Sequence, residues 1–212
     1  MKNIFKTGIL ALMLAMGVAS CDKDDPIGSR VTVYPDMSLN GEAVVVLTEG
    51  DSFTDEGAVS FIGEEEVEVT TTGSVDPTTP GVYDLYYSSV NEDGFSRQIR
   101  RTVIVLSAEP SAINLEGTFY RNGNANNIVR LADRVYTSDN AGGLGPADAD
   151  NFIHITFYNI DDERLYGPYQ TNTSESGINV ETNIGTIINE NNFTWVLYAS
   201  ATYGTAVRNF TR

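Results

Sequence analysis

The chain has 212 residues, with 13 Lys and Arg against 29 Asp and Glu, a single His and a single Cys, and a formal net charge of −16 at pH 7. This charge disfavours binding to nucleic acids and adsorption on anionic lipid headgroups, because both need clustered cations. One His and one Cys also exclude a metal site made of several such ligands. We expect a neutral or cationic partner and no cofactor.

Residues 1–20 have the anatomy of a secretory signal. Lys2 and Lys6 give a basic start, the apolar run 9–16 follows, and small residues come directly before Cys21. A transmembrane helix needs about 20 apolar residues, so this run is too short to span a bilayer. Removing residues 1–20 leaves 11 basic and 29 acidic residues, which gives the mature chain a formal charge of −18.

The expected cleavage point resembles the lipobox of bacterial lipoproteins, in which an aliphatic residue and two small residues precede a Cys. The matching residues are Val18, Ala19, Ser20 and Cys21. The resemblance implies that Cys21 receives diacylglycerol and becomes the acylated N-terminus after cleavage. More than one acyl chain is needed for firm anchoring, because a single chain binds a membrane only marginally. The alternative is an ordinary secretory signal that leaves Cys21 as a free thiol.

Residues 21–30 start with Cys-Asp-Lys-Asp-Asp and are predicted to be an acidic tether. The run resembles the export signal of outer-membrane surface lipoproteins in Gram-negative, glycan-degrading gut bacteria, which implies a lipid-anchored protein exposed at the cell surface. In enteric bacteria an Asp directly after the Cys, here Asp22, is instead associated with retention in the inner membrane. A flexible, solvated tether is compatible with either location.

Residues 31–106 are predicted to form a domain of short β-strands, because β-branched and aromatic runs alternate with turn residues and no helical period is present. The predicted strands are 31–34, 43–48, 58–61, 66–70, 82–90 and 98–106. Alternation places Tyr83, Leu85 and Tyr87 on one inward face. The turn 91–94 predicts that the last two strands form a hairpin.

Several segments of this domain together resemble the bacterial surface protein Ig-like domain. They are 49–58, 81–87, Asn91, Gly94 and 101–105. The family has a β-sandwich fold and occurs as spacers and modules in exported proteins. The resemblance therefore implies a fold and a compartment, but no activity, because such sandwiches serve many unrelated roles.

Residues 107–112 are polar or small and include a Pro, which predicts a linker to a second β domain at 113–212. Its predicted strands are 152–158, 164–166, 178–180, 185–188, 193–198 and 206–210. We expect an antiparallel meander or a small barrel, so the whole chain is predicted to be all-β. Phe193, Trp195 and Leu197 share one strand face and are predicted to be core.

The second domain also resembles an uncharacterised C-terminal domain found on lipoproteins of the same gut bacteria. The segments that carry this resemblance are 115–119, 135–139, 193–195 and 203–208. Such domains are often encoded beside outer-membrane uptake systems of the starch-utilisation type. The resemblance implies a context and assigns no site.

Aromatic residues are the candidate ligand-binding groups, because their faces stack on sugar rings. We select four tyrosines that are predicted to be partly exposed: Tyr158, Tyr166, Tyr169 and Tyr203. His154 lies opposite the inward-facing Ile153, Ile155 and Phe157, so a solvent-facing position is predicted for it rather than a catalytic one.

The loop 138–151 is rich in Gly and Asp and is typical of a flexible surface segment. Asp139, Asp148 and Asp150 offer oxygen ligands for Ca²⁺, but their spacing does not match the EF-hand pattern. We keep the loop only as a weak candidate for calcium.

Two functions fit these patterns. The first is a non-catalytic accessory or ligand-capture lipoprotein of a glycan-uptake system, in which the Ig-like domain is a stalk. The alternative is a structural or adhesive surface protein that binds other proteins. An enzyme ranks third, because a hydrolase would depend on a pair of carboxylates whose separation a sequence does not give.

Overall fold

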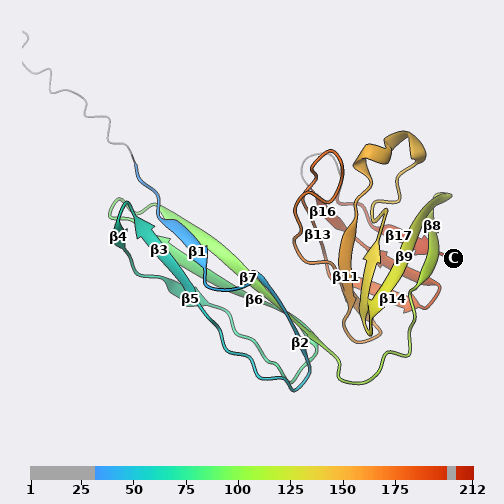
Figure 1. Ribbon diagram of the computed structural model, residues 1–212, viewed down its shortest axis with the longest axis horizontal. Coiled ribbons are helices and arrows are strands. Elements are labelled where there is room, and N and C mark those ends of the chain that lie inside the picture. Colours follow the sequence, from blue (N-terminus) through green and yellow to red (C-terminus); the bar gives the residue numbers. More distant parts are fainter. Residues whose placement is uncertain (1–31, 200–203) are drawn as a thin grey trace, which may run out of the picture. The chain divides into compact units, whose positions relative to one another are not determined.

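The computed structural model describes residues 32–199 and 204–212 (Figure 1), and Tyr34–Arg212 form one compact unit. The predicted signal 1–20 with its lipobox residues 18–21, the predicted tether 21–30 and Tyr203 lie outside the described residues. Within those residues the regular structure is β except for η1 (Pro146–Asn151), a 3₁₀ helix, so the all-β prediction is confirmed. Nowhere in this described part is a helix long and apolar enough to cross a membrane.

The N-terminal strands form two sheets. One has the order β1-β3-β4, made of β1 (Asp36–Leu39), β3 (Ala58–Ile62) and β4 (Glu65–Glu66). The other has the order β2-β7-β6-β5, made of β2 (Val44–Thr48), β7 (Ser96–Leu106), β6 (Gly81–Val90) and β5 (Thr70–Thr72). All pairs are antiparallel except β2 and β7, which run parallel.

The long hairpin of β6 and β7 is the centre of this sandwich and confirms the prediction for its strands. The two strands are in register from Gly81 opposite Val105 to Val90 opposite Ser96. Inward-facing side chains of β6 are buried, with Leu85 5% and Tyr87 0% exposed.

Two predicted strands of the sandwich are wrong. Residues 32–35 are not in a strand, and β1 begins at Asp36. The β-branched run is followed by Pro35, which has no N–H for a sheet ladder, and Tyr34 remains 55% exposed. The predicted strand 66–70 is divided between two sheets, because β4 pairs with β3 and β5 pairs with β6. Val67 still donates its N–H to the Ser60 carbonyl at 2.9 Å, next to the β3–β4 ladder.

The C-terminal strands of the described residues form a closed antiparallel barrel of eight strands, in the order β10-β11-β12-β14-β15-β17-β8-β9. The strands are β8 (Gly117–Arg121), β9 (Asn124–Ala132), β10 (Val135–Ser138), β11 (Ile155–Asn159), β12 (Arg164–Tyr166), β14 (Gly185–Asn189), β15 (Asn192–Trp195) and β17 (Arg208–Thr211). β13 (Val180–Thr182) pairs separately with β16 (Leu197–Ala199). The barrel form of the prediction is therefore confirmed.

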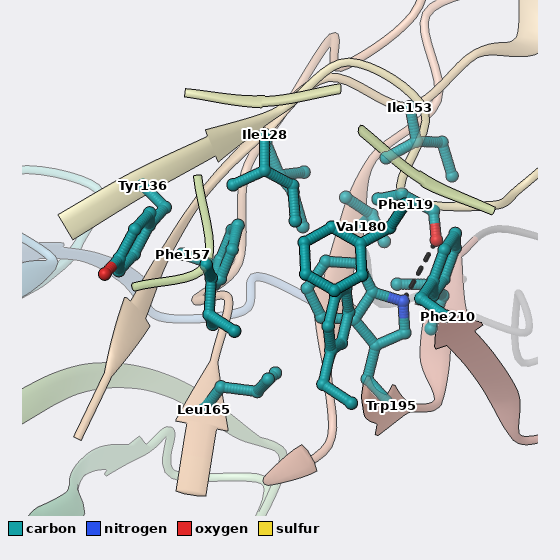
Figure 2. Close-up of a cluster of buried hydrophobic side chains, with 14 of the residues drawn as sticks. Phe119, Ile128, Tyr136, Ile153, Phe157, Leu165, Val180, Trp195 and Phe210 are labelled. Atoms are coloured by element: carbon teal, nitrogen blue, oxygen red, sulfur yellow. Dashed lines mark hydrogen bonds between the residues drawn. The ribbon is translucent and has the colours of Figure 1, made fainter. Parts of the chain in front are cut away.

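Buried aromatic rings, among them Phe119, Trp195 and Phe210, gather in the barrel (Figure 2). The ring centroid of Phe193 lies 5.0 Å from that of Phe119, 5.1 Å from that of Trp195 and 5.2 Å from that of Phe210. The predicted core residues Phe193, Trp195 and Leu197 are at most 1% exposed. An eight-stranded barrel has an interior just wide enough for side chains, so these rings leave the outside and the rims for a ligand.

The loop 138–151 begins as a plug for this core, with residues 140–143 buried, whereas residues 146–150 are exposed. The prediction of a surface segment is therefore wrong for the first part of the loop. Ala141 is fully buried, and its carbonyl accepts the indole N–H of Trp195 at 3.0 Å. Asn140 is 1% exposed and holds the loop in shape by donating to the carbonyls of Ala125 and Leu144, each at 2.9 Å. A short polar side chain that satisfies the loop's own backbone replaces the missing sheet partners.

The segment 107–112 is tied to the barrel by side chains. Ser111 donates to Asp162 at 2.6 Å, and the buried Arg134 donates to Asp162 and to the carbonyl of Glu109, each at 2.9 Å. Burial alone would raise the pKa of Asp162, but the hydrogen bond from Ser111 and the charge of Arg134 help to hold it below its ordinary value.

Candidate functional site on the barrel

A cavity of about 400 Å³ lies over the outward face of β9, β10 and β11. We call it the sheet-face pocket. Its lining consists of Asn127, Val129, Thr137, Ser138, Asp139, His154, Ile155, Thr156 and Gln170. Most of these residues carry a hydrogen-bonding side chain, and Val129 and Ile155 supply apolar surface.

The alternation of three neighbouring strands places Val129, Thr137 and Thr156 outside the barrel. Ser138 and Ile155 border the pocket from the inward face and are 2% and 3% exposed. Val129 is opposite Thr137, and Thr137 is opposite Thr156, so one outward row crosses β9, β10 and β11. The inward positions next to this row, Ile128 and Phe157, are at most 2% exposed. Because side chains alternate between the two faces of a strand, the buried aromatic core fixes which residues line the pocket.

Asp139 forms one wall of the pocket and is hydrogen-bonded to the neighbouring strand β9. Asp139 accepts the backbone N–H of Asn127 at 2.7 Å and the Asn127 side-chain amide at 2.7 Å. Both oxygens of the carboxylate therefore have a partner, and the pair is fixed before any ligand arrives. Each carboxylate oxygen keeps a second acceptor position.

The opposite wall is held by Gln170, whose amide pairs with β11 as a neighbouring strand would. Its Oε1 accepts the N–H of Thr156 at 2.8 Å, and its Nε2 donates to the Thr156 carbonyl at 2.9 Å. His154 precedes β11 and anchors its own backbone by donating to Thr173 at 2.7 Å. Its side chain is exposed, which confirms the solvent-facing position predicted from the alternation.

The tyrosines selected from the sequence do not gather at this pocket. Tyr166 is only 4% exposed, so the exposure predicted for it is wrong. It packs in a cluster with Ile104, Leu106 and Ile160. Tyr158 packs against the same cluster, whereas Tyr169 is 51% exposed and is not among the lining residues of the sheet-face pocket.

Tyr166 is held in its buried position by a hydrogen bond from its hydroxyl as well as by apolar packing of its ring. Its hydroxyl donates to Glu181. The two carboxylate oxygens of Glu181 also accept hydrogen bonds from Nη2 of Arg100, at 2.9 and 2.8 Å. Burial and then the bond to Glu181 raise the pKa of Tyr166 far above its ordinary value. The ring therefore has structural contacts on its apolar and its polar side.

The three aspartates of the weak calcium candidate are not brought together. Asp139 lies on the sheet-face pocket, whereas Asp148 and Asp150 belong to η1. In the described ranges no group of three or more His, Cys, Asp or Glu side chains is arranged to hold a metal ion.

A second cluster of titratable groups lies in the sandwich and joins the segments that resemble the Ig-like family. Asp55 accepts the Tyr87 hydroxyl at 2.6 Å and the N–H of Gly57 at 3.2 Å, and it also accepts the guanidinium of Arg101. Arg101 is 1% exposed and donates through Nε to the carbonyl of Glu42 at 3.0 Å. These contacts link loop, strand and hairpin, so we assign the cluster to the scaffold.

The pKa values in this cluster follow from the same contacts. Partial burial alone would raise the pKa of Asp55, but the hydrogen bonds from Tyr87 and Gly57 and the charge of Arg101 hold it below its ordinary value. Burial and the bond to Asp55 raise the pKa of Tyr87 to about 12. Asp55 is therefore charged and Tyr87 neutral at pH 7, which matches the pairing with Arg101.

The sequence analysis missed several pocket residues, and Asn127 and Gln170 are the two whose side chains hold its walls. Asn127 is the last of three asparagines in 124–127, of which Asn126 is fully buried and Asn127 faces outward. Gln170 comes from an irregular segment, and no periodicity indicates that it folds back over β11. The asparagines that precede Ile128 and Val129 in β9 were the available signal.

Residues 37–105 match the family model described as "Bacterial surface protein, Ig-like domain". This part of the chain is therefore similar to the Ig-like domains of bacterial surface proteins, as the resemblance implied. The match covers about a third of the chain and ends before the barrel. The lipobox and the C-terminal resemblance thus remain predictions.

No curated protein matches the chain. Among solved structures, it is similar to the lipoprotein BT2262 from Bacteroides thetaiotaomicron, at 20% identity over 83% of this chain and 97% of that chain, with a TM-score of 0.37. It is also similar to the M60 catalytic domain with two CBM51 domains from Clostridium perfringens ZmpB, at 10% identity over 85% of this chain and 21% of that one, with a TM-score of 0.33. Neither similarity carries an argument about function at these TM-scores.

Proposed function

We propose that this protein is a lipid-anchored surface protein whose Ig-like domain carries a non-catalytic, ligand-capturing barrel, and that the ligand is a neutral glycan destined for uptake. The sheet-face pocket is the observation that supports this proposal most directly. It has the volume of a small-molecule site and gathers amide, hydroxyl, imidazole and carboxylate groups around apolar Val129.

The chemistry of the lining favours a neutral ligand with many hydroxyl groups. Asp139 and Gln170 can accept further hydrogen bonds, and His154 can donate or accept, so vicinal hydroxyls find partners of both kinds. The chain's net charge of −16 favours a neutral ligand over an anionic one at this acidic wall. The pocket is open on a sheet face, which suits one part of a longer chain.

The anchor supports the same role. Acylation at Cys21 would keep the protein at the membrane, and the Ig-like domain is of the kind found in bacterial surface proteins. Uptake from the surface would need release of the intact ligand, so we expect capture without cleavage.

The test is a glycan array probed with the full-length chain in detergent, followed by titration of the retained neutral glycan. Val129→Trp fills the pocket from an exposed position and is expected to reduce affinity by about tenfold or more. Leu131→Trp is the matched control, because it lies on the same strand, is 59% exposed and is outside the pocket.

The outcomes separate capture from adhesion. Loss of glycan binding in Val129→Trp with normal binding in Leu131→Trp is the expected result. If no glycan is retained and a protein partner is recovered instead, the adhesive alternative replaces this proposal. Chromatography of the released glycan is expected to show an unchanged chain length, and shortened products would indicate an enzyme.

A further inference from the structure

A second cavity, of about 300 Å³, lies beside the plug loop at the barrel rim, and we call it the rim pocket. It is lined by Arg121, Gly142, Leu144, Asp148, Asn151, Gly204 and Arg208. We propose that the rim pocket binds a carboxylate carried by a sugar, with Arg121 and Arg208 holding the carboxylate. This site is separate from the sheet-face pocket and does not depend on the function proposed for it.

The two arginines reach the rim pocket from inside the barrel. In β17, Arg208 and Phe210 are both at most 5% exposed, whereas Asn209 between them is exposed. In β8, Arg121 shares the inward face with Phe119, which is fully buried. β8 and β17 are neighbours in the barrel. Alternation and pairing therefore direct both guanidinium groups toward the same end of the aromatic core.

The plug loop fixes the position of Arg121. Its Nη1 donates to the Gly142 carbonyl at 3.1 Å and lies 3.4 Å from that of Gly143. Gly143 has φ +60°, and a Cβ there would lie 2.8 Å from the Cβ of Arg121. Only glycine tolerates both the left-handed conformation and this close approach. The arginine stem is thus packed against the loop, which orients its guanidinium before a ligand binds.

Arg208 is fixed in a similar way, by backbone carbonyls of the segment that leads into β17. Its Nη1 donates to the carbonyl of Ala206 at 2.9 Å, and its Nη2 donates to that of Gly204 at 3.3 Å. The side chain lines the rim pocket although the residue is only 5% exposed. A guanidinium held by backbone carbonyls keeps its full positive charge, because arginine does not lose its proton in proteins.

The charge balance of the rim pocket differs from that of the chain. The chain has 29 acidic residues against 13 basic ones. Among the described lining residues of this pocket, two are arginines and one, Asp148, is acidic. Planar guanidinium groups match carboxylates in shape and charge. Asp148 and Asn151 add polar groups suited to hydroxyls, so the combined lining fits an acidic sugar better than a bare anion.

The test is titration of the full-length chain in detergent with an oligogalacturonide and with a neutral galactose oligomer of the same length. Arg121→Gln removes one positive charge and is expected to weaken oligogalacturonide binding by about tenfold. Arg130→Gln is the matched control, because Arg130 lies on the neighbouring strand β9, pairs with Asp133 at 2.6 Å and is outside the rim pocket. Thermal unfolding of each variant checks that it is folded.

A second variant changes affinity in the opposite direction. Asp148→Asn removes the negative charge beside the bound carboxylate, and its exposed position leaves folding intact. We expect it to tighten oligogalacturonide binding severalfold and to leave the neutral oligomer unaffected. A purely structural role of the rim would produce no such gain.

Several outcomes would overturn this assignment. It is rejected if the oligogalacturonide does not bind, if it binds no better than the neutral oligomer, or if Arg121→Gln and Asp148→Asn both leave its affinity unchanged. Val129→Trp separates the two sites, since it is expected to block the sheet-face pocket without changing oligogalacturonide binding. Binding that disappears in Val129→Trp would place the acidic ligand in the sheet-face pocket and reject the rim site.

Discussion

The sheets of residues 36–106 hold a buried guanidinium beside a small apolar cluster, whereas the core of the barrel is built on aromatic rings. In the sandwich, Arg101 is 1% exposed and joins three segments through Asp55, Tyr87 and backbone carbonyls. In the barrel, the ring of Phe193 packs against the rings of Phe119, Trp195 and Phe210. The sandwich thus uses its polar cluster for folding, whereas outward polar residues of the barrel line the sheet-face pocket.

The largest effect is expected from the aromatic core. Trp195→Ala removes ring contacts with Phe157 and Phe210 at 5.3 and 5.8 Å and leaves the Ala141 carbonyl without its donor. Large-to-small changes of this type cost about 3 to 5 kcal/mol. We expect a loss of about 4 kcal/mol in the free energy of unfolding, measured by chemical denaturation.

The control for the barrel is Tyr198→Ala, close to Trp195 in the chain but 54% exposed. It is expected to change the free energy of unfolding by less than about 0.5 kcal/mol. A loss below about 1.5 kcal/mol in Trp195→Ala would mean that the barrel is not held by this core.

The next largest loss of stability is expected from the charged cluster of the sandwich. Asp55→Asn leaves the buried guanidinium of Arg101 without its countercharge, and breaking a buried pair by removing one partner costs about 3 to 5 kcal/mol. Because the Asp55 side chain is 28% exposed, we expect the lower end, about 3 kcal/mol. Asp36→Asn, which breaks an exposed pair with Arg97, is the control and should cost less than about 1 kcal/mol.

Acid should weaken the sandwich through the same carboxylate, by a smaller amount than the substitution. The pKa of Asp55 is below its ordinary value of 3.8 in the folded chain. Its charge therefore stabilises the fold fully above that value, and the contribution is lost as pH falls through the folded pKa. Denaturation at a series of pH values should show a steeper acid-induced loss in the wild type than in Asp55→Asn. Equal slopes would contradict this role of Asp55.

The sequence indicated much of the core and many of the strands of both regions, because alternation of apolar residues is a local signal. It was wrong for two strands of the sandwich and did not predict β8, β9 and β10 of the barrel. It placed Tyr87 and Leu85 inside the sandwich and Phe193, Trp195 and Leu197 inside the barrel. The sequence did not predict features that depend on contacts between distant segments. One such feature is the parallel pairing of β2 with β7, which joins segments more than 50 residues apart. No periodicity in either strand encodes that partner.

The candidate site was harder to predict than the fold. Tyr166 alternates as an outward residue of a short strand, yet it is buried by residues distant in sequence, such as Leu106. Gln170 reaches the sheet-face pocket only because an irregular segment folds back on β11. The Gly-rich loop was read as flexible since composition does not reveal that Asn140 binds the loop's own carbonyls. Sites assembled from such loops need the tertiary structure.

The smallest effect on stability, and the sharpest on function, is expected at His154. The side chain is exposed and lines the sheet-face pocket, so His154→Ala should change the free energy of unfolding by less than about 0.5 kcal/mol. Loss of one hydrogen bond to the neutral glycan should weaken its binding by about tenfold. Denaturation and titration on the same preparation measure both quantities. If binding is unchanged, the polar groups of the barrel's outer face are not a ligand site, and the contrast with the sandwich, whose polar groups serve the fold, no longer holds.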